Sequence, residues 1–476
     1  MAHYDLIVIG GGLAGLAAAI RAAHFAPSVR LFEQHAVVGG LNSWYCRDGR
    51  VIDVGLHALT NYVPEDDRNA PLNRVLRQLR IKRDRLDLVP QGHSEIVFPG
   101  NTLRLENDFV AFRRQIHAQF PDDAAGFDAL VEAIRREAYS GDARPYRSTR
   151  WRLRQYIKSR RLRDMLCMPV MYYGNPRPVD MDFQAFCTIF QSIFIEGFAR
   201  PRHGMRPFLE LLSGRLQEEG GVLSTGCGIA KIHHDGRRIT GVVDARGQCH
   251  DADNYIAAIG SEALLSLLDC PGGLSRHLPL VRKAGNHGNR PLNSFVEGVF
   301  RLPKPVSDYG LAAAITFLCD EDEFVFDAPL GGNAPCGSML ICAPGNYPGC
   351  EEDSGILRLS AMTSCQAWSP YDLTAEEYIS RKQSYARRLL ELLGTRHPRL
   401  AADARMADLF TPRTICRYTR QSMGGIYGGT MKLKDFRTGF KNMLIAGTDQ
   451  GLLGIVGSML SGVIAANMAL ARKGGA

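Results

Sequence analysis

The chain has 476 residues, of which 45% are hydrophobic and 22% charged, a composition typical of a globular protein with two or three domains. This composition excludes a disordered chain, a collagen and a repetitive scaffold. The formal net charge of +8 is modest for the length. The 12 cysteines form no C-x-x-C pair. Their scatter indicates reduced thiols of an intracellular protein and predicts no metal site.

The N-terminus carries no basic stretch and no small-residue cleavage site before its first apolar segment, so we expect no secretory signal and a cytoplasmic location. Residues 452–471 are apolar over a length that could span a bilayer. The segment contains glycines, serines and Asn467. These residues favour a buried helix over a membrane span.

A glycine-rich turn follows the first apolar segment. Residues 6–9 predict a short buried strand, and residues 10–15 read G-x-G-x-x-G before an alanine-rich helix. Gly10 permits a tight turn, Gly12 lets the backbone approach a pyrophosphate, and Gly15 lets the helix pack close to the strand. The uncapped N–H groups at the helix start, at Leu13 and Ala14, suit phosphate oxygens.

A second strand is predicted at residues 29–32 and ends at Glu33. A carboxylate at this position accepts hydrogen bonds from the ribose hydroxyls of a dinucleotide. Strand, glycine turn, helix and acid in this order predict a dinucleotide site, but the glycines alone do not distinguish NAD from FAD.

Several further segments resemble the FAD-dependent amine oxidase superfamily, and within it the branch of carotenoid desaturases, prolycopene isomerases and retinol saturases. Gly39-Gly40-Leu41 is similar to the family's second glycine pair, with Leu41 in place of the arginine common in amine oxidases. Residues 51–57 contain the D-x-G-x-H pattern that ends at His57. Residues 411–414 and 424–428 are similar to the T-P-x-T and G-x-x-Y-G segments of the carotenoid branch.

The resemblance implies FAD as the cofactor, held without a covalent bond. It places Ile229 near the adenine, Asp449 near the ribityl or phosphate portion, and the start of the last helix, near Gly454, at the pyrimidine end of the flavin. The FAD-binding residues that it implies are Gly10, Gly12, Leu13, Ala14, Gly15, Glu33, Gly39, Gly40, Leu41, Ile229, Gly447, Asp449, Gly454, Ile455 and Val456.

These blocks recur at the beginning, middle and end of the chain, so the resemblance implies an α/β fold with a discontinuous Rossmann-type FAD-binding domain. We expect this domain to comprise residues 1–85, 205–285 and 405–476. An inserted α+β substrate domain would comprise residues 86–204 and 286–404.

Two features of the first insertion bear on the substrate. An aromatic and aliphatic stripe at helical spacing is either core or the wall of an apolar tunnel. Residues 147–163 are rich in arginine interleaved with apolar side chains, which predicts either a solvated basic helix or a helix that lies on a membrane surface. The aromatic and aliphatic stripe named first consists of Phe183, Phe186, Phe190, Ile193, Phe194 and Phe198. Nucleic acid is not expected as a partner of the basic segment.

The function that the resemblance implies is FAD-dependent desaturation of a polyisoprenoid by hydride transfer to flavin. The alternatives are dehydroxylation of a squalene-type alcohol, polyene isomerisation or saturation, and amine oxidation. His57 is the candidate proton acceptor and Tyr427 a weaker one. The oligomeric state is left open.

Overall fold

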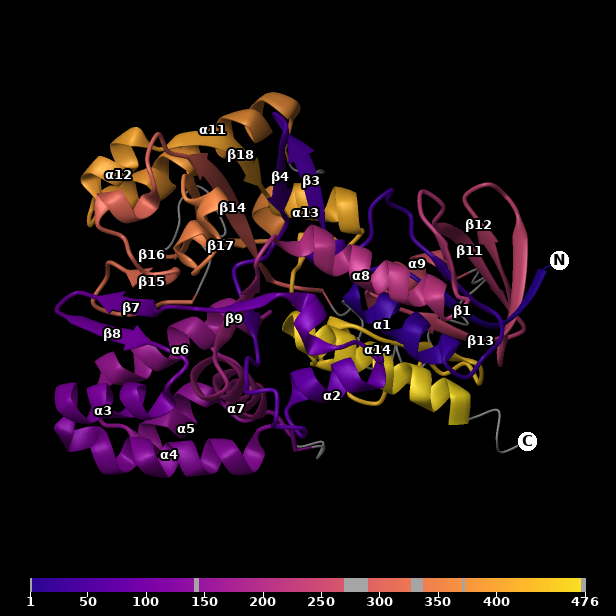
Figure 1. The fold of residues 1–476 in the computed structure, drawn as a ribbon, viewed down its shortest axis with the longest axis horizontal. Helices are drawn as coiled ribbons and strands as arrows, with labels where there is room; N and C mark the ends of the chain where they lie inside the picture. Colours follow the sequence, from indigo (N-terminus) through magenta and orange to yellow (C-terminus); the bar gives the residue numbers. More distant parts are fainter. Residues whose placement is uncertain (1, 141–144, 269–289, 327–336, 370–372, 472–476) are drawn as a thin grey trace.

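The computed structural model describes residues 2–140, 145–268, 290–326, 337–369 and 373–471. Two halves, each built on a seven-stranded sheet, lie side by side (Figure 1). The first half contains both the earliest and the latest helices of the chain, in indigo and yellow. The expected α/β class with a Rossmann-type domain is confirmed.

The first sheet brings together strands from the beginning, middle and end of the chain. Its strands run in the order β10-β2-β1-β13, with β19 beside the second half of β13, and all these pairs are parallel. Two antiparallel strands, β12 and β11, continue from the first half of β13. The bounds are β1 Ala2–Ile9, β2 Val29–Phe32, β10 Val222–Ser224, β11 Ile229–His234, β12 Ile239–Asp244, β13 Cys249–Ala257 and β19 Met443–Ile445.

Helices α1 (Leu13–Ala23), α8 (Met205–Glu218) and α14 (Gly454–Ala471) share one hydrophobic core with β1 and β2. A Cβ on Gly462 of α14 would lie 2.0 Å from the carbonyl oxygen of Ala14, so glycine is required where the two helices cross. In the described chain, α14 is the one helix long and apolar enough to cross a membrane, and half of it is buried.

The second sheet is mixed, in the order β18-β14-β17-β16-β15-β7-β8. Helices α11 and α12 pack on one face, and α3 to α7 pack on the other (Figure 1). The strands are β7 Ser94–Phe98, β8 Asn101–Leu105, β14 Asn293–Arg301, β15 Ile315–Cys319, β16 Ser338–Cys342, β17 Ile356–Ser364 and β18 Arg405–Phe410. The helices are α3 Phe109–Gln119, α4 Ala124–Glu137, α5 Thr149–Tyr156, α6 Arg160–Gly174, α7 Phe183–Phe190, α11 Ala375–Gly394 and α12 Pro398–Asp403.

Short strands and helices connect the two halves. The hairpin of β3 and β4 follows the second glycine pair, and β5 pairs with β9, which also pairs with β6. The expected domain boundary at residue 405 coincides with the start of β18, which pairs with β14 of the second sheet. We therefore propose a boundary after β18 instead. The bounds are α2 Pro71–Gln78, β3 Trp44–Arg47, β4 Arg50–Asp53, β5 Leu59–Thr60, β6 Leu88–Pro90, β9 Phe198–Pro201, α9 Ser261–Leu267 and α13 Pro412–Thr419.

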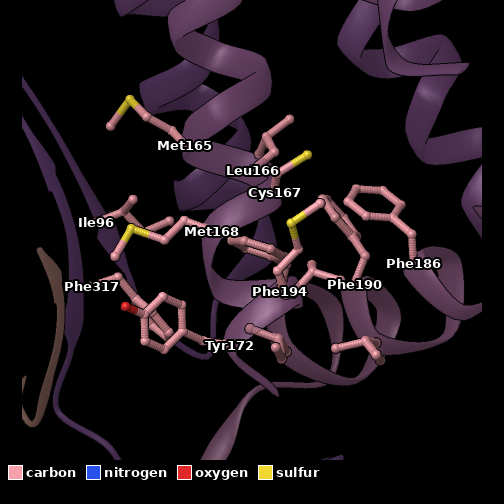
Figure 2. Packing of buried hydrophobic residues seen from close by; sticks show 14 of the residues in the cluster. Ile96, Met165, Leu166, Cys167, Met168, Tyr172, Phe186, Phe190, Phe194 and Phe317 are labelled. Atoms are coloured by element: carbon pink, nitrogen blue, oxygen red, sulfur yellow. The ribbon is translucent and has the colours of Figure 1, made fainter. Parts of the chain in front are cut away.

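The aromatic stripe is core. Its side chains are fully buried between α6, α3 and the second sheet, and the ring of Phe190 packs against that of Phe194 at a tilt of 36°, with ring centroids 4.5 Å apart (Figure 2). The helix changes to a π-helix over Gln191–Ile195, which lets Ser192 face a cavity while Phe194 stays buried. The tunnel-wall interpretation of this stripe is therefore wrong.

The basic segment at residues 147–163 is not one helix, because α5 ends at Tyr156 and α6 begins at Arg160. Much of its charge is neutralised by carboxylates within the chain. Arg150 lies 3.3 Å from Asp164, and Arg161 lies 3.1 Å from Asp322. Less positive charge is thus available for a membrane surface than the sequence suggested, and membrane contact remains a prediction.

Candidate functional site

One cavity of about 1190 Å³ extends from the glycine turn after β1 into the second half of the molecule. Its first part is lined by residues at the carboxyl ends of β1, β2 and β19, the edge at which doubly wound sheets bind nucleotides. Its second part reaches α6, β14 and β16. The cavity therefore joins the nucleotide-binding edge of one sheet to the apolar wall of the other.

Most of the residues predicted from the sequence line this cavity. They are Gly10, Gly12, Leu13, Ala14, Glu33, Gly39, Gly40, Leu41, His57, Ile229, Tyr427, Gly447, Gly454 and Ile455. Three others, Gly15, Asp449 and Val456, lie behind the wall. A Cβ on Gly15 would come within 1.8 Å of the carbonyl oxygen of Gly10, so this glycine permits close packing of helix and strand.

The glycine turn leaves room for a ligand. A Cβ on Gly12 would meet no atom within 4 Å, so this glycine is not required by protein packing. The space beside Gly447 is equally open, although its positive φ of 108° itself favours glycine. Gly12 is also the N-cap of α1 and provides no side-chain cap. The first N–H groups of α1 therefore receive no acceptor from an N-cap side chain. They face the cavity, where they can donate hydrogen bonds to a bound anion.

Glu33 lies in the part of the cavity wall where the ribose of the dinucleotide is expected. Its carboxylate accepts hydrogen bonds from the N–H groups of Gly11 (2.6 Å) and His35 (2.7 Å) and lines the cavity. Each carboxylate oxygen can accept more than one hydrogen bond, so the side chain can still accept from ribose hydroxyls. Cavity, free helix N-terminus and fixed carboxylate together fit the phosphates and ribose of FAD.

Asp449 does not contact this cavity. Its carboxylate accepts hydrogen bonds from the N–H groups of Ser261 (2.7 Å) and Gly429 (2.8 Å), at the start of α9 and in a neighbouring loop. Its neighbour Thr448 lines the cavity instead. The geometry therefore indicates a structural role for Asp449 in tying three segments together behind the cofactor site.

Replacement of Asp449 by alanine is expected to lower the free energy of unfolding by about 2 kcal/mol, because two buried N–H groups lose their acceptor. FAD affinity should change less than about fivefold, a loss below about 1 kcal/mol. Urea unfolding of the apoprotein and titration with FAD measure the two quantities. A large loss of affinity at unchanged stability would instead indicate direct contact with the cofactor.

His57 forms a buried ion pair at the junction of the two parts of the cavity. Its Nε2 lies 3.2 Å from Glu297 Oε2 and 3.3 Å from Ser360 Oγ. Burial by itself would lower the pKa of His57, but the Glu297 carboxylate and the Cys342 thiol outweigh it and raise this pKa to about 9. At neutral pH the ring is therefore an imidazolium.

The role of His57 as proton acceptor stays a prediction. Its ion pair with Glu297 favours the protonated ring, which can donate a proton but not accept one. Glu297 is equally unsuited to accept a proton. Burial would raise its pKa, yet Arg358 and His57 hold it at about 2. Arg358 Nε donates to Glu297 Oε1 at 2.5 Å.

Tyr427 lines the cavity, and its hydroxyl donates to the backbone carbonyl of Tyr172. Burial raises the pKa of Tyr427, so the phenol stays protonated at neutral pH. Among the described lining residues the one lysine is Lys382 on α11, and no contact between it and His57 is found. A lysine beside His57, which the amine-oxidising alternative would favour, is not found in the described wall.

The sequence interpretation missed Thr448, Glu297, Ser360 and Arg358. Glu297 is the one acidic residue of β14 and Arg358 the one charged residue of β17, and such charges in largely buried strands could have marked them. The pairing of Glu297 with Arg358 could not be found in this way, because it depends on the register in which the two strands pair, and the contact of Glu297 with His57 joins segments 240 residues apart.

The chain is similar over residues 13–470 to the family described as flavin containing amine oxidoreductase. It is 26% identical over 285 residues to 4,4'-diaponeurosporene oxygenase of Staphylococcus haemolyticus, covering 54% of this chain and 55% of that protein. It is 29% identical over 125 residues to the chloroplastic prolycopene isomerase of Arabidopsis thaliana, covering 26% of this chain and 20% of that protein. The chain thus spans about half or less of the length of these curated relatives.

Solved structures share the fold at low identity. An oxidoreductase from Methanosarcina mazei superposes with a TM-score of 0.68 at 15% identity, covering 98% of this chain and 99% of that one. Cyclohexylamine oxidase from Brevibacterium oxydans gives a TM-score of 0.60 at 16% identity, covering 99% of both chains. The family match extends over nearly the whole chain. The protein therefore belongs to the flavin-containing amine oxidoreductase family and is an FAD-dependent oxidoreductase.

Proposed function

We propose that this oxidoreductase acts on a long, apolar polyisoprenoid of carotenoid type and introduces a double bond into it. The observation that carries the proposal is the second part of the cavity, which is continuous with the FAD site and lined almost entirely by apolar and aromatic side chains. These are Ala58, Tyr172, Tyr173, Ile189, Phe295, Leu340, Ile426, Tyr427 and Leu453. We refer to them as the apolar arm.

An apolar arm suits a substrate without charges, which is recognised by shape and by burial of hydrocarbon. Two of the three tyrosine hydroxyls in the arm already have partners: Tyr427 donates to a backbone carbonyl, and Tyr172 hydrogen-bonds with Ser338 Oγ (3.0 Å). The third, on Tyr173, is a neutral hydroxyl without a protein partner, and it offers no charge to pair with an amine. The names of the two curated relatives, an oxygenase and an isomerase of carotenoids, agree with this substrate class.

The bound flavin would supply hydride acceptance, and the protein supplies orientation and a dry environment. Ile455 and Ser458, near the start of α14, line the cavity. The positive end of this helix favours negative charge at that position. The aromatic walls of Tyr173 and Phe295 exclude water from the reacting chain.

A second candidate is a reaction in which the protein donates a proton, such as saturation, isomerisation or dehydroxylation of a similar chain. The observation that favours it is the ion pair of His57 with Glu297, which keeps the ring protonated in the cavity wall. No proton acceptor of comparable placement is found among the described lining residues. Desaturation takes electrons from the chain, saturation and dehydroxylation deliver electrons to it, and isomerisation leaves its oxidation state unchanged.

Anaerobic mixing of the oxidised holoenzyme with C30 and C40 polyenes distinguishes them. Bleaching of the flavin with formation of a longer chromophore supports desaturation. Reoxidation of the pre-reduced holoenzyme by the polyene supports saturation or dehydroxylation, and a rearranged product without net flavin change supports isomerisation. Bleaching by small amines alone contradicts the proposed substrate class.

Replacement of Ile426 by tryptophan is expected to narrow the apolar arm, since this residue lines it and is only partly buried. We expect the rate with a C40 polyene to fall at least about tenfold, about 1.4 kcal/mol in activation free energy, while FAD binding is unchanged. Val222→Trp, at an exposed position on β10, is the matched control. Equal rates for the two variants would show that the substrate does not occupy the arm.

A further inference from the structure

His57 belongs to a continuous network of buried charges that the sequence did not indicate. Glu297 contacts His57 on one side and Arg358 on the other. Arg358 Nη1 donates to the carbonyl of Leu56 (3.0 Å), the residue before His57. Side-chain exposure is 16% for His57, 11% for Glu297 and 2% for Arg358. Ions this deeply buried are costly unless each is paired, so their arrangement restricts how each side chain can move.

Among the described residues around His57, Glu297 is the one whose carboxylate contacts the ring. The Cys342 thiol, at the end of β16, donates to the backbone carbonyl of His57 (3.9 Å). The hydroxyl of Tyr347, which lies after this strand, donates to the same carbonyl (3.4 Å). Ser360 approaches from β17 as a neutral hydroxyl. The cation Arg200 on β9 is paired with two other carboxylates, Asp53 at 2.7 Å and Asp353 at 3.4 Å.

We propose that Glu297, clamped by Arg358, is a positioning residue that holds His57 as an imidazolium where the FAD site and the apolar arm meet. The ring then presents a fixed positive charge to the reacting atoms and stabilises negative charge that develops there. Arg358 has a separate role, because it donates hydrogen bonds both to the Glu297 carboxylate and to the backbone carbonyl of Leu56. The inference concerns the FAD-dependent reaction of this site and does not require the substrate to be a polyisoprenoid.

Titration of His57 in the intact holoenzyme tests the charge directly and needs no substrate. With ¹³C-labelled histidine, the His57 resonance is assigned by its loss in His57→Gln. We expect wild-type His57 to stay protonated above pH 8. A midpoint at or below the ordinary value of about 6.5 would overturn the proposal, whatever the substrate proves to be.

Glu297→Gln removes the charge and keeps the shape of the side chain. It is expected to weaken proton binding at His57 between about tenfold and a thousandfold, because an opposite charge at this distance shifts a titration by about 1–3 pH units. Glu297→Asp should restore most of the effect. Ser360→Ala, which removes a neutral hydroxyl that contacts the same ring nitrogen and donates to Glu297 Oε2 (3.3 Å) but leaves the carboxylate in place, should change proton affinity less than about threefold. Equal shifts in Glu297→Gln and Ser360→Ala would contradict the proposal.

The pH dependence of flavin bleaching separates positioning from a merely structural role. In Glu297→Gln the rate at pH 8 is expected to fall at least about tenfold and to recover toward pH 6, as His57 gains its proton. The wild-type rate should show no such inflection between pH 6 and 8. A uniformly lower rate with the wild-type pH profile would mean that Glu297 only maintains the fold.

Discussion

Replacement of Gly12 by valine is expected to abolish FAD binding in a chain that still folds. The backbone at Gly12 is extended (φ −68°, ψ 176°), so a side chain is tolerated, and a Cβ there would meet no protein atom within 4 Å. The new methyl groups would occupy the part of the cavity that faces the first turn of α1, where the pyrophosphate fits. We expect at least a hundredfold loss of FAD affinity, about 2.8 kcal/mol.

Titration of the apoprotein with FAD, followed by flavin fluorescence, measures this loss, and urea unfolding measures stability. The stability of the Gly12→Val apoprotein should stay within about 1 kcal/mol of wild type, as for other helix N-cap substitutions. Gly15→Ala is the contrasting variant. Its Cβ would lie 1.8 Å from the carbonyl oxygen of Gly10, so it should destabilise the apoprotein by about 3 kcal/mol or more. If both variants unfold alike, the open space at Gly12 is not the reason for its glycine.

The nucleotide-binding half could be predicted from sequence because each of its signals is local. The glycine turn, the strand before it and the helix after it lie within residues 2–23, and the structure shows all three in the expected order. Glu33 follows β2 directly, so its place at the edge of the sheet depends only on that strand. Gly447 and Gly454 likewise flank β19 and α14.

The reacting end of the cavity could not be predicted, because it depends on contacts between distant segments. His57 was chosen from a motif, but its protonation state is set by Glu297, which lies 240 residues later in β14. The stripe from Phe183 to Phe198 could be core or tunnel wall by spacing alone. The packing of α3, α6 and β7 against the stripe shows that it belongs to the hydrophobic core, and this packing cannot be read from the spacing.

The boundary between the two halves also could not be predicted from local sequence patterns. β18 immediately precedes the T-P-R-T motif at residues 411–414, so sequence assigned it to the FAD-binding domain, yet its hydrogen bonds go to β14. A strand's partner is not encoded in its own residues when the pairing spans a hundred residues. The joint between halves instead depends on buried polar contacts such as the one at Asp53.

Replacement of Asp53 by alanine is expected to lower the free energy of unfolding by about 3 kcal/mol, since it removes the nearer of the two carboxylates that pair with the buried Arg200 and leaves only Asp353, at 3.4 Å. Asp53 Oδ2 lies 2.7 Å from Arg200 Nη2, and the two side chains are 6% and 3% exposed. Its Oδ1 accepts from the N–H of Met205 (2.8 Å), the first residue of α8. The carboxylate thus ties the β3–β4 hairpin to β9 and to a helix of the FAD-binding half.

Urea unfolding of the holoenzyme and apoprotein measures the loss, and Glu210→Ala is the matched control. Glu210 pairs with Arg206 on the surface of α8 at 2.9 Å, with side-chain exposures of 60% and 47%, so its removal should cost less than about 0.5 kcal/mol. Because Arg200 also reaches the carbonyl of Leu56 (3.5 Å), Asp53→Ala should further loosen the segment that carries His57. A loss no larger than that of Glu210→Ala would show that Asp353 or water compensates the charge of Arg200 and that the Asp53 contact does not stabilise the joint between the halves.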